Sequence, residues 1–97
     1  MNIRYSLAGS SFEWDHIKAK KNREKHGITF EKACEVFLDP LLHFAETNDA
    51  DDKTQAVIGE TGDEHLLFVV HIVKEEDLIR LISARPVTAH ERREYEE

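Results

Sequence analysis

The sequence predicts an α+β fold in which two N-terminal helices and a C-terminal helix pack on an antiparallel sheet of about four strands. Helix caps and one helical apolar stripe lie between Asp15 and Asp39, apolar residues follow the period of strands from Leu42 onward, and a helix-capping pattern follows Pro86. Because 97 residues can build one core but not two, residues 1–97 are expected to form a single domain, with 1–11 as an N-terminal extension or edge strand.

The first helix is expected to end at His26. Phe12 and Trp14 alternate with polar neighbours, as in a short strand, and Asp15 is suited to cap the helix that follows. Gly27 then supplies the stop, because glycine readily adopts the left-handed conformation that ends helices.

The second helix is expected to begin after Thr29, which can cap it. Its apolar residues fall at i, i+3, i+4 and i+7 and predict one buried stripe: Phe30, Ala33, Cys34 and Phe37. The helix should end at Asp39, because the residue before Pro40 is pushed out of the helical region. Lys32 stands where glutamate would complete a capping box.

The second half of the chain has the pattern of strands, at residues 42–47, 55–60, 65–73 and 78–85. Short polar connections at 61–64 and 74–77 favour antiparallel hairpins. The apolar run 66–70 indicates a central strand covered on both faces. Thr88 and Glu91 have the spacing of a capping box, which predicts a last helix through Tyr95.

Charge is unevenly distributed along the chain. The formal net charge is -7, yet five of the 13 basic residues lie in the first helix: Lys18, Lys20, Lys21, Arg23 and Lys25. Only Glu24 opposes them there. This asymmetry argues against nucleic-acid binding by the whole surface and favours a localised anion site on an acidic body.

One face of the basic helix is a candidate phosphate track. The side chains at i, i+3, i+4 and i+7 project together: Lys18, Lys21, Asn22 and Lys25. The alternative is a solvated face that keeps the protein soluble. His26 is the best placed of the six histidines for proton transfer, because imidazole exchanges a proton near neutrality. Its alternative role is a C-terminal helix partner that the helix dipole favours in the charged form.

Arg80 and Arg85 interrupt the last apolar strand. A planar, permanently charged guanidinium suits a site that stabilises charge on a transferring phosphoryl group. Strict alternation places the two arginines on opposite faces, so both reach one site only if the strand bulges or Arg85 lies past its end. The alternative for each is a surface ion pair with one of the many acids.

Other residue types indicate no further chemistry. No pair has the spacing of a zinc motif, so no metal or other cofactor is expected. Cys34 lies on an apolar stripe and Ser83 has no companion triad, so neither is expected to be a nucleophile, and His71 is expected in the core. A single cysteine, the lack of an apolar run of ~20 residues and the absence of a secretion-signal pattern favour a cytoplasmic protein without membrane association.

Short motifs along the chain resemble one family, the BrnT ribonuclease toxins of type II toxin-antitoxin systems. The opening is similar to FEWDxxKxxxNxxKHGxxFExA, on Phe12-Glu13-Trp14-Asp15, Lys18, Asn22, Lys25-His26-Gly27, Phe30-Glu31 and Ala33. The end resembles IRxISAR and ERxxY, on Ile79-Arg80, Ile82-Ser83-Ala84-Arg85, Glu91-Arg92 and Tyr95. Their order and spacing cover roughly residues 12–97.

This resemblance implies a RelE-like fold and metal-independent RNA cleavage that inhibits translation. It also implies neutralisation by a small ribbon-helix-helix antitoxin, with promoter DNA bound only through the antitoxin complex. Carried over to this sequence, it makes Lys25, His26, Arg80 and Arg85 the catalytic candidates. The RNA contacts that it implies are Lys18, Lys21 and Asn22.

The sequence departs from this family at one position. The family usually carries an arginine five residues before the glycine of the second long strand, and counting back from Gly59 places Thr54 there. Lys53 is adjacent, but a shift of one residue in a strand points to the other face. The alternative function is therefore a catalytically weak or inactive homologue that acts as an antitoxin-binding module in promoter autoregulation.

Overall fold

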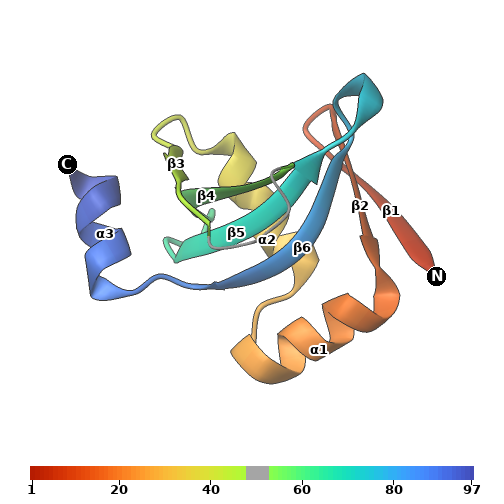
Figure 1. Cartoon of the computed structure of the whole chain (residues 1–97), viewed down its shortest axis with the longest axis horizontal. Helices are drawn as coiled ribbons and strands as arrows, with labels where there is room; N and C mark the ends of the chain where they lie inside the picture. The colour runs from red at the N-terminus through yellow and green to blue at the C-terminus, as the bar shows by residue number, and fades with distance from the viewer. Residues whose placement is uncertain (48–52) are drawn as a thin grey trace.

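The computed structural model describes residues 1–47 and 53–97 and has a six-stranded sheet in the order β1-β2-β6-β5-β4-β3 (Figure 1). The strands are β1 (Asn2–Leu7), β2 (Ser10–Asp15), β3 (His43–Ala45), β4 (Thr54–Glu60), β5 (Leu66–Val73) and β6 (Ile79–Pro86). The helices are α1 (His16–His26), α2 (Phe30–Cys34) and α3 (Ala89–Glu96), with short 3-10 helices η1 (Glu35–Leu38) and η2 (Glu75–Asp77). The predicted α+β class is confirmed.

The predicted sheet of about four antiparallel strands is wrong in extent and direction. The N-terminal residues form a hairpin, β1–β2, and β2 pairs with β6 in parallel, through Phe12 with Ile79 and Glu13 with Arg80. A parallel pair joins segments far apart in the chain and leaves no turn signal in the sequence. The pairs β3–β4, β4–β5 and β5–β6 are antiparallel, which confirms the two predicted hairpins.

Helix ends follow the capping residues closely. The Asp15 side chain accepts from Lys18 N at 3.0 Å, and Gly27 ends α1 with a φ of 72°. Thr29 caps α2, but this helix tightens into η1 after Cys34, so the single regular helix predicted through Phe37 is wrong in its second half. The predicted capping box before α3 is confirmed.

Helices lie on opposite faces of the sheet (Figure 1). One face packs against α2 and η1, whose Phe30, Ala33, Cys34 and Val36 join Val57, Leu67, Val69 and Leu81 in the main core. On the other face, Tyr95 of α3 and Val87 pack against a smaller cluster of Ala56, Ile58, Leu66 and Phe68. We call this second face the α3 face. Both faces of β5 are covered at its start, as predicted.

α1 lies along the edge of β6 beyond the point where β2 ends. Its Ala19 packs against the main core. Near the start of α1, the rings of Trp14 and Phe30 pack edge-to-face with their centroids 5.7 Å apart. No helix in the described part of the chain is long and apolar enough to cross a membrane.

Candidate functional site

A bulge in β6 places the two predicted arginines on one face of the sheet. Val70 pairs with Ser83 but His71 pairs with Leu81, so β6 has one extra residue, Ile82, between these pairs. Arg80 is opposite Ile72 and Arg85 is opposite Phe68, and these two partners are four residues apart on β5. Both arginines therefore lie on the α3 face, at opposite ends of β6 and separated by roughly 13 Å.

Arg85 is held by α3. Its Nη1 and Nη2 donate to Glu91 Oε1 and Oε2, each at 2.8 Å, and its guanidinium carbon lies 4.2 Å from the centre of the Phe68 ring. The hydrogen bonds from Arg85 hold the pKa of Glu91 below its usual value although burial opposes them, and the same bonds raise the pKa of Arg85. The pair is therefore fully charged, and its fork geometry is that with which arginine binds phosphate.

Arg80 lies at the other end of β6 in a different ion cluster. Its Nη1 donates to Glu13 Oε2 at 2.9 Å and to Asn2 Oδ1 at 3.3 Å. The structure thus brings Arg80 to the same face as Arg85, but not to the same place.

Asn22 anchors α1 beside Arg85. It is buried, its Nδ2 donates to Ala84 O at 2.8 Å and to Ile28 O at 3.1 Å, and its Oδ1 accepts from Ala84 N at 3.0 Å. These bonds occupy the side-chain amide, so Asn22 positions α1 on β6. The direct RNA contact expected from the sequence stays a prediction. His26, half-buried, follows one turn later on the same helix.

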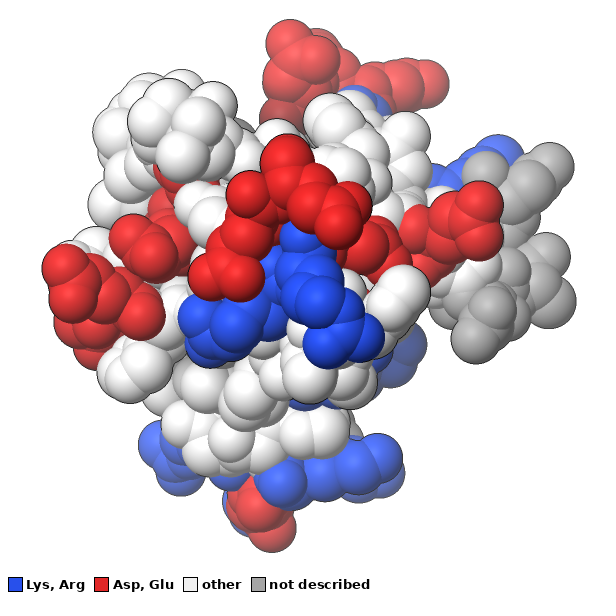
Figure 2. Space-filling view, turned by 90° about the vertical axis from the view of Figure 1, so that its left-hand side faces the viewer, with Lys and Arg blue, Asp and Glu red and all other residues white. Residues whose placement is uncertain are grey.

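The cations of α1 divide into two flanks. Lys20 and Arg23 line a cavity of about 290 Å³ with Ile3 and Phe30, on the side toward α2. The exposed side chains of Lys18, Lys21 and Lys25 lie on the opposite flank, because they follow helical spacing on the other side of Asn22. In Figure 2 the Lys and Arg side chains at the level of α1 form a separate group below those in the middle of the face.

Thr54 is on the same face as the two arginines. It is 8% exposed and pairs with Ile72, which pairs in turn with Arg80. Residues opposite one another in neighbouring strands point to the same face. The position at which the sequence lacks the expected arginine thus belongs to the α3 face.

Two acids that organise these arginines were not identified from the sequence. The sequence motifs include both acids, and Glu91 also has capping-box spacing, but no motif indicates that Glu13 pairs with Arg80 or that Glu91 pairs with Arg85. The sequence offered one signal for Glu13, a charge between two strand aromatics, Phe12 and Trp14. The burial of Glu13, at 2% exposure, depends on residues from other strands.

His71 and Cys34 lie in the core, away from the arginines. His71 is in the core as predicted, 2% exposed, with its ring 5.0 Å from Phe37 between centroids, and burial lowers its pKa. Burial raises the pKa of Cys34 to about 12, so its thiol is protonated at neutral pH. Within residues 1–47 and 53–97, no three His, Cys, Asp or Glu side chains form a group that would hold a metal ion.

Comparison with known proteins identifies a protein family and a similar solved structure. A sequence model of the family described as "Ribonuclease toxin, BrnT, of type II toxin-antitoxin system" matches residues 14–91. The crystal structure of the Brucella abortus ribonuclease toxin BrnT superposes with a TM-score of 0.64 at 25% sequence identity, over 77% of this chain and 92% of that one. No curated protein matches the chain.

The fold and the site define a class of small α+β protein that presents arginines on one sheet face beside a lysine-rich helix. The chain belongs to the BrnT family of ribonuclease toxins of type II toxin-antitoxin systems. Membership confirms the resemblance seen in the sequence and implies an antitoxin partner.

Proposed function

We propose that this chain is a toxin that cleaves RNA without a metal ion and so inhibits translation. The observation that carries the proposal is the β6 bulge, which turns Arg80 and Arg85 to the same face of the sheet. Family membership supports the choice of RNA as substrate. Two arginines on one face suit a substrate whose charge repeats along its backbone.

The reaction needs no cofactor because the RNA carries its own nucleophile. The 2'-oxygen attacks the adjacent phosphorus, the bond from phosphorus to the 5'-oxygen breaks, and a cyclic 2',3'-phosphate and a free 5'-hydroxyl result. A base takes the proton of the 2'-hydroxyl, and an acid gives one to the leaving oxygen. The protein must also stabilise the charge that grows on the phosphate oxygens.

We assign the charge-stabilising role to Arg85, whose fork already binds a carboxylate in bidentate geometry. His26 and Lys25, at the end of α1, are the proposed proton-transfer groups. This choice is supported by Asn22, which fixes α1 beside Ala84, the neighbour of Arg85. RNA approaching along α1 would contact Lys18 and Lys21, both exposed.

Membership of a type II family supports control by an antitoxin. We propose a small ribbon-helix-helix antitoxin, with promoter DNA bound only through the complex. The excess of acids outside α1 favours this indirect route, because an overall charge of -7 disfavours free DNA binding by the toxin.

RNA cleavage by the purified chain in the presence of a metal chelator tests the proposal. Wild type should cleave, and Arg85→Ala should lower the rate by about 100-fold, the usual cost of removing one group that stabilises transition-state charge. Arg93→Ala, which removes an exposed arginine from α3, is the matched control and should cleave like wild type. Growth arrest on expression should follow the same order. Intact RNA with wild type under these conditions would refute the proposal.

A second function is favoured by the pairing of both arginines with carboxylates and by Thr54. The chain would then be an inactive homologue that binds the antitoxin and takes part in promoter autoregulation. It predicts that wild type binds the antitoxin and represses the promoter with it, but neither cleaves RNA nor slows growth. Gain of toxicity in Thr54→Arg alone would support this reading, whereas cleavage by wild type that Arg85→Ala abolishes would exclude it.

A further inference from the structure

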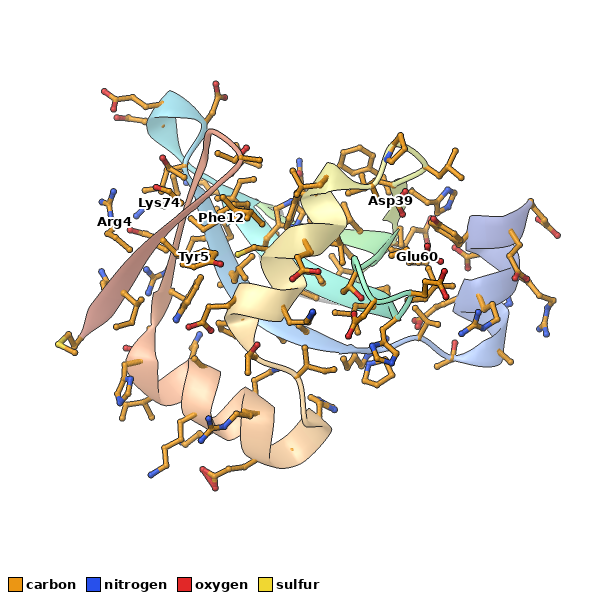
Figure 3. The ribbon with its side chains drawn as sticks, turned by 180° about the vertical axis from the view of Figure 1, so that it is seen from behind. Arg4, Tyr5, Phe12, Asp39, Glu60 and Lys74 are labelled. Carbon is orange, nitrogen blue, oxygen red and sulfur yellow. The ribbon has the colours of Figure 1, made fainter. Side chains whose placement is uncertain are left out.

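A cluster of cations surrounds Glu13 at the end of the sheet remote from α3. Arg4 Nε lies 3.3 Å from Glu13 Oε1, and Lys74 Nζ and Arg80 Nη1 lie 3.1 Å and 2.9 Å from Glu13 Oε2. We call Arg4, Lys74 and Arg80 the Glu13 cluster. Its members come from β1, the connection after β5, and β6. Figure 3 shows Arg4 and Lys74 side by side, far from Asp39 and Glu60.

The cluster contains more positive charge than Glu13 neutralises. Burial raises the pKa of Glu13, but hydrogen bonds from Arg80 and Lys74 outweigh burial and lower it, so the carboxylate is ionised. One carboxylate is therefore shared by three cations. Arg80 is the least exposed of the three cations, at 24% side-chain exposure, and already pairs with Glu13. The more exposed Arg4 and Lys74, at 71% and 49% side-chain exposure, therefore add little to the stability of the fold.

The Glu13 cluster borders a cavity of about 900 Å³ on the α3 face. Lys53 adds a fourth cation to the lining, and the exposed acids Glu75 and Glu76 also line it. Ile72, Val73 and Leu78 supply apolar wall. Cations beside an apolar wall suit a strand of RNA, whose phosphates need charge and whose bases need an apolar surface.

We infer that the Glu13 cluster is an RNA-binding subsite, in which Arg4 and Lys74 contact phosphates and Glu13 positions Arg80. The subsite rests on the proposed function for its choice of RNA. It extends the binding surface along β6, because Arg80 and Arg85 share one face and lie roughly 13 Å apart. Arg4 lies in the N-terminal β1–β2 hairpin, before the first residue that the family model matches. The phosphate contact of Arg4 would therefore come from outside the matched segment.

The test is binding of a short single-stranded RNA in which every 2'-hydroxyl is methylated. Such RNA lacks the nucleophile, so its binding by the full chain is measured without cleavage. Arg4→Ala with Lys74→Ala should weaken binding by about tenfold and reduce the slope of log K against log salt by about 1.4, as expected for two lost phosphate contacts.

The matched control is Lys20→Ala with Arg23→Ala, which removes the same charges from exposed positions facing the cavity near α2. It should bind within about twofold of wild type. Arg4→Lys with Lys74→Arg keeps both charges and should retain binding. Glu75→Gln with Glu76→Gln should strengthen binding, because it removes negative charge from the cavity lining. Thermal unfolding of each variant separates loss of binding from loss of the fold.

Several results would overturn the inference. These are no binding by wild type, equal binding by Arg4→Ala with Lys74→Ala, or equal weakening by the control pair. Cleavage of unmodified RNA is measured in parallel and reports on the proposed function separately. If wild type binds methylated RNA through the cluster but cleaves nothing, the subsite stands and the proposed activity fails. If wild type cleaves but Arg4→Ala with Lys74→Ala binds normally, the proposed activity stands and the subsite fails.

Discussion

Arg85 on β6 and Glu91 on α3 form a two-fold hydrogen-bonded ion pair, with both guanidinium-to-carboxylate distances at 2.8 Å. Glu91 also serves the start of its own helix, since its Oε1 accepts from Thr88 N at 2.9 Å. The two Arg85 guanidinium nitrogens that bind this carboxylate are the donors with which arginine binds phosphate. If Arg85 binds an RNA phosphate as proposed, Glu91 competes with that phosphate for the guanidinium.

Glu91→Gln should therefore strengthen RNA binding and raise cleavage by threefold to tenfold, about 1 kcal/mol. Glutamine removes the charge but can still complete a capping box, so α3 should keep its start. Binding of methylated RNA and cleavage of unmodified RNA are the measurements. Glu94→Gln is the control, because Glu94 lies on the same helix but contacts His43 and His90. Equal gains in both variants would show that only overall charge matters.

Asn22→Ala should destabilise the protein by about 2–4 kcal/mol, because the buried N–H and C=O of Ala84 lose their partner together. Denaturant unfolding measures this loss. Lys21→Ala, an exposed change on the same helix, should alter the free energy of unfolding by no more than ~0.5 kcal/mol. If the two variants were equally stable, Asn22 would not anchor α1.

Gly59→Ala should cost more than about 2 kcal/mol, since a Cβ at this position would lie 2.7 Å from Val36 Cβ and 2.9 Å from Val36 O. The backbone of η1 would have to move away from β4. Gly27→Ala has open space around it and a φ of 72°, so its cost should be only about 1 kcal/mol of backbone strain. Thermal unfolding of both variants should show this order, and a reversed order would contradict the close approach of η1.

Acid should release α3 through Asp39. Its Oδ2 accepts from Tyr95 O–H at 2.6 Å and from Glu60 N at 2.8 Å. Burial raises the pKa of Asp39, but these hydrogen bonds, with one from Leu41 N, outweigh burial and lower it. A carboxyl whose pKa is lower in the folded state stabilises that state above its unfolded pKa of about 3.9, and this contribution disappears as pH falls through the folded pKa.

Hydrogen exchange of α3 amides at decreasing pH measures this release. Protection of α3 should decrease below about pH 4 in wild type. Tyr95→Phe removes the hydroxyl, so its α3 should be less protected at pH 7 and should change less on acidification. Burial and the bond to Asp39 raise the pKa of Tyr95 to about 12, so alkali should weaken the same contact as pH rises through that value. An unchanged acid response in Tyr95→Phe would exclude this pair as the cause.

Features that depend on neighbouring residues could be predicted from the sequence. The caps at Asp15, Gly27 and Thr29 and the capping box of Thr88 with Glu91 satisfy helix ends within a few residues, so local sequence specifies them. The central position of β5 also followed from its uninterrupted apolar run.

The sequence by itself thus determined the helix caps, the α+β class and the family resemblance. It also indicated that Arg80 and Arg85 could reach one site only if the strand bulges or Arg85 lies past its end. Only the tertiary structure decided that the bulge exists, at Ile82, and that β2 joins β6 in parallel. Only the tertiary structure also showed that Asn22 hydrogen-bonds to Ala84, 62 residues away, and that Glu13 is surrounded by cations from three parts of the chain. The physical reason is that these arrangements depend on contacts between distant segments, whose register and hydrogen-bond partners are set only when the sheet assembles.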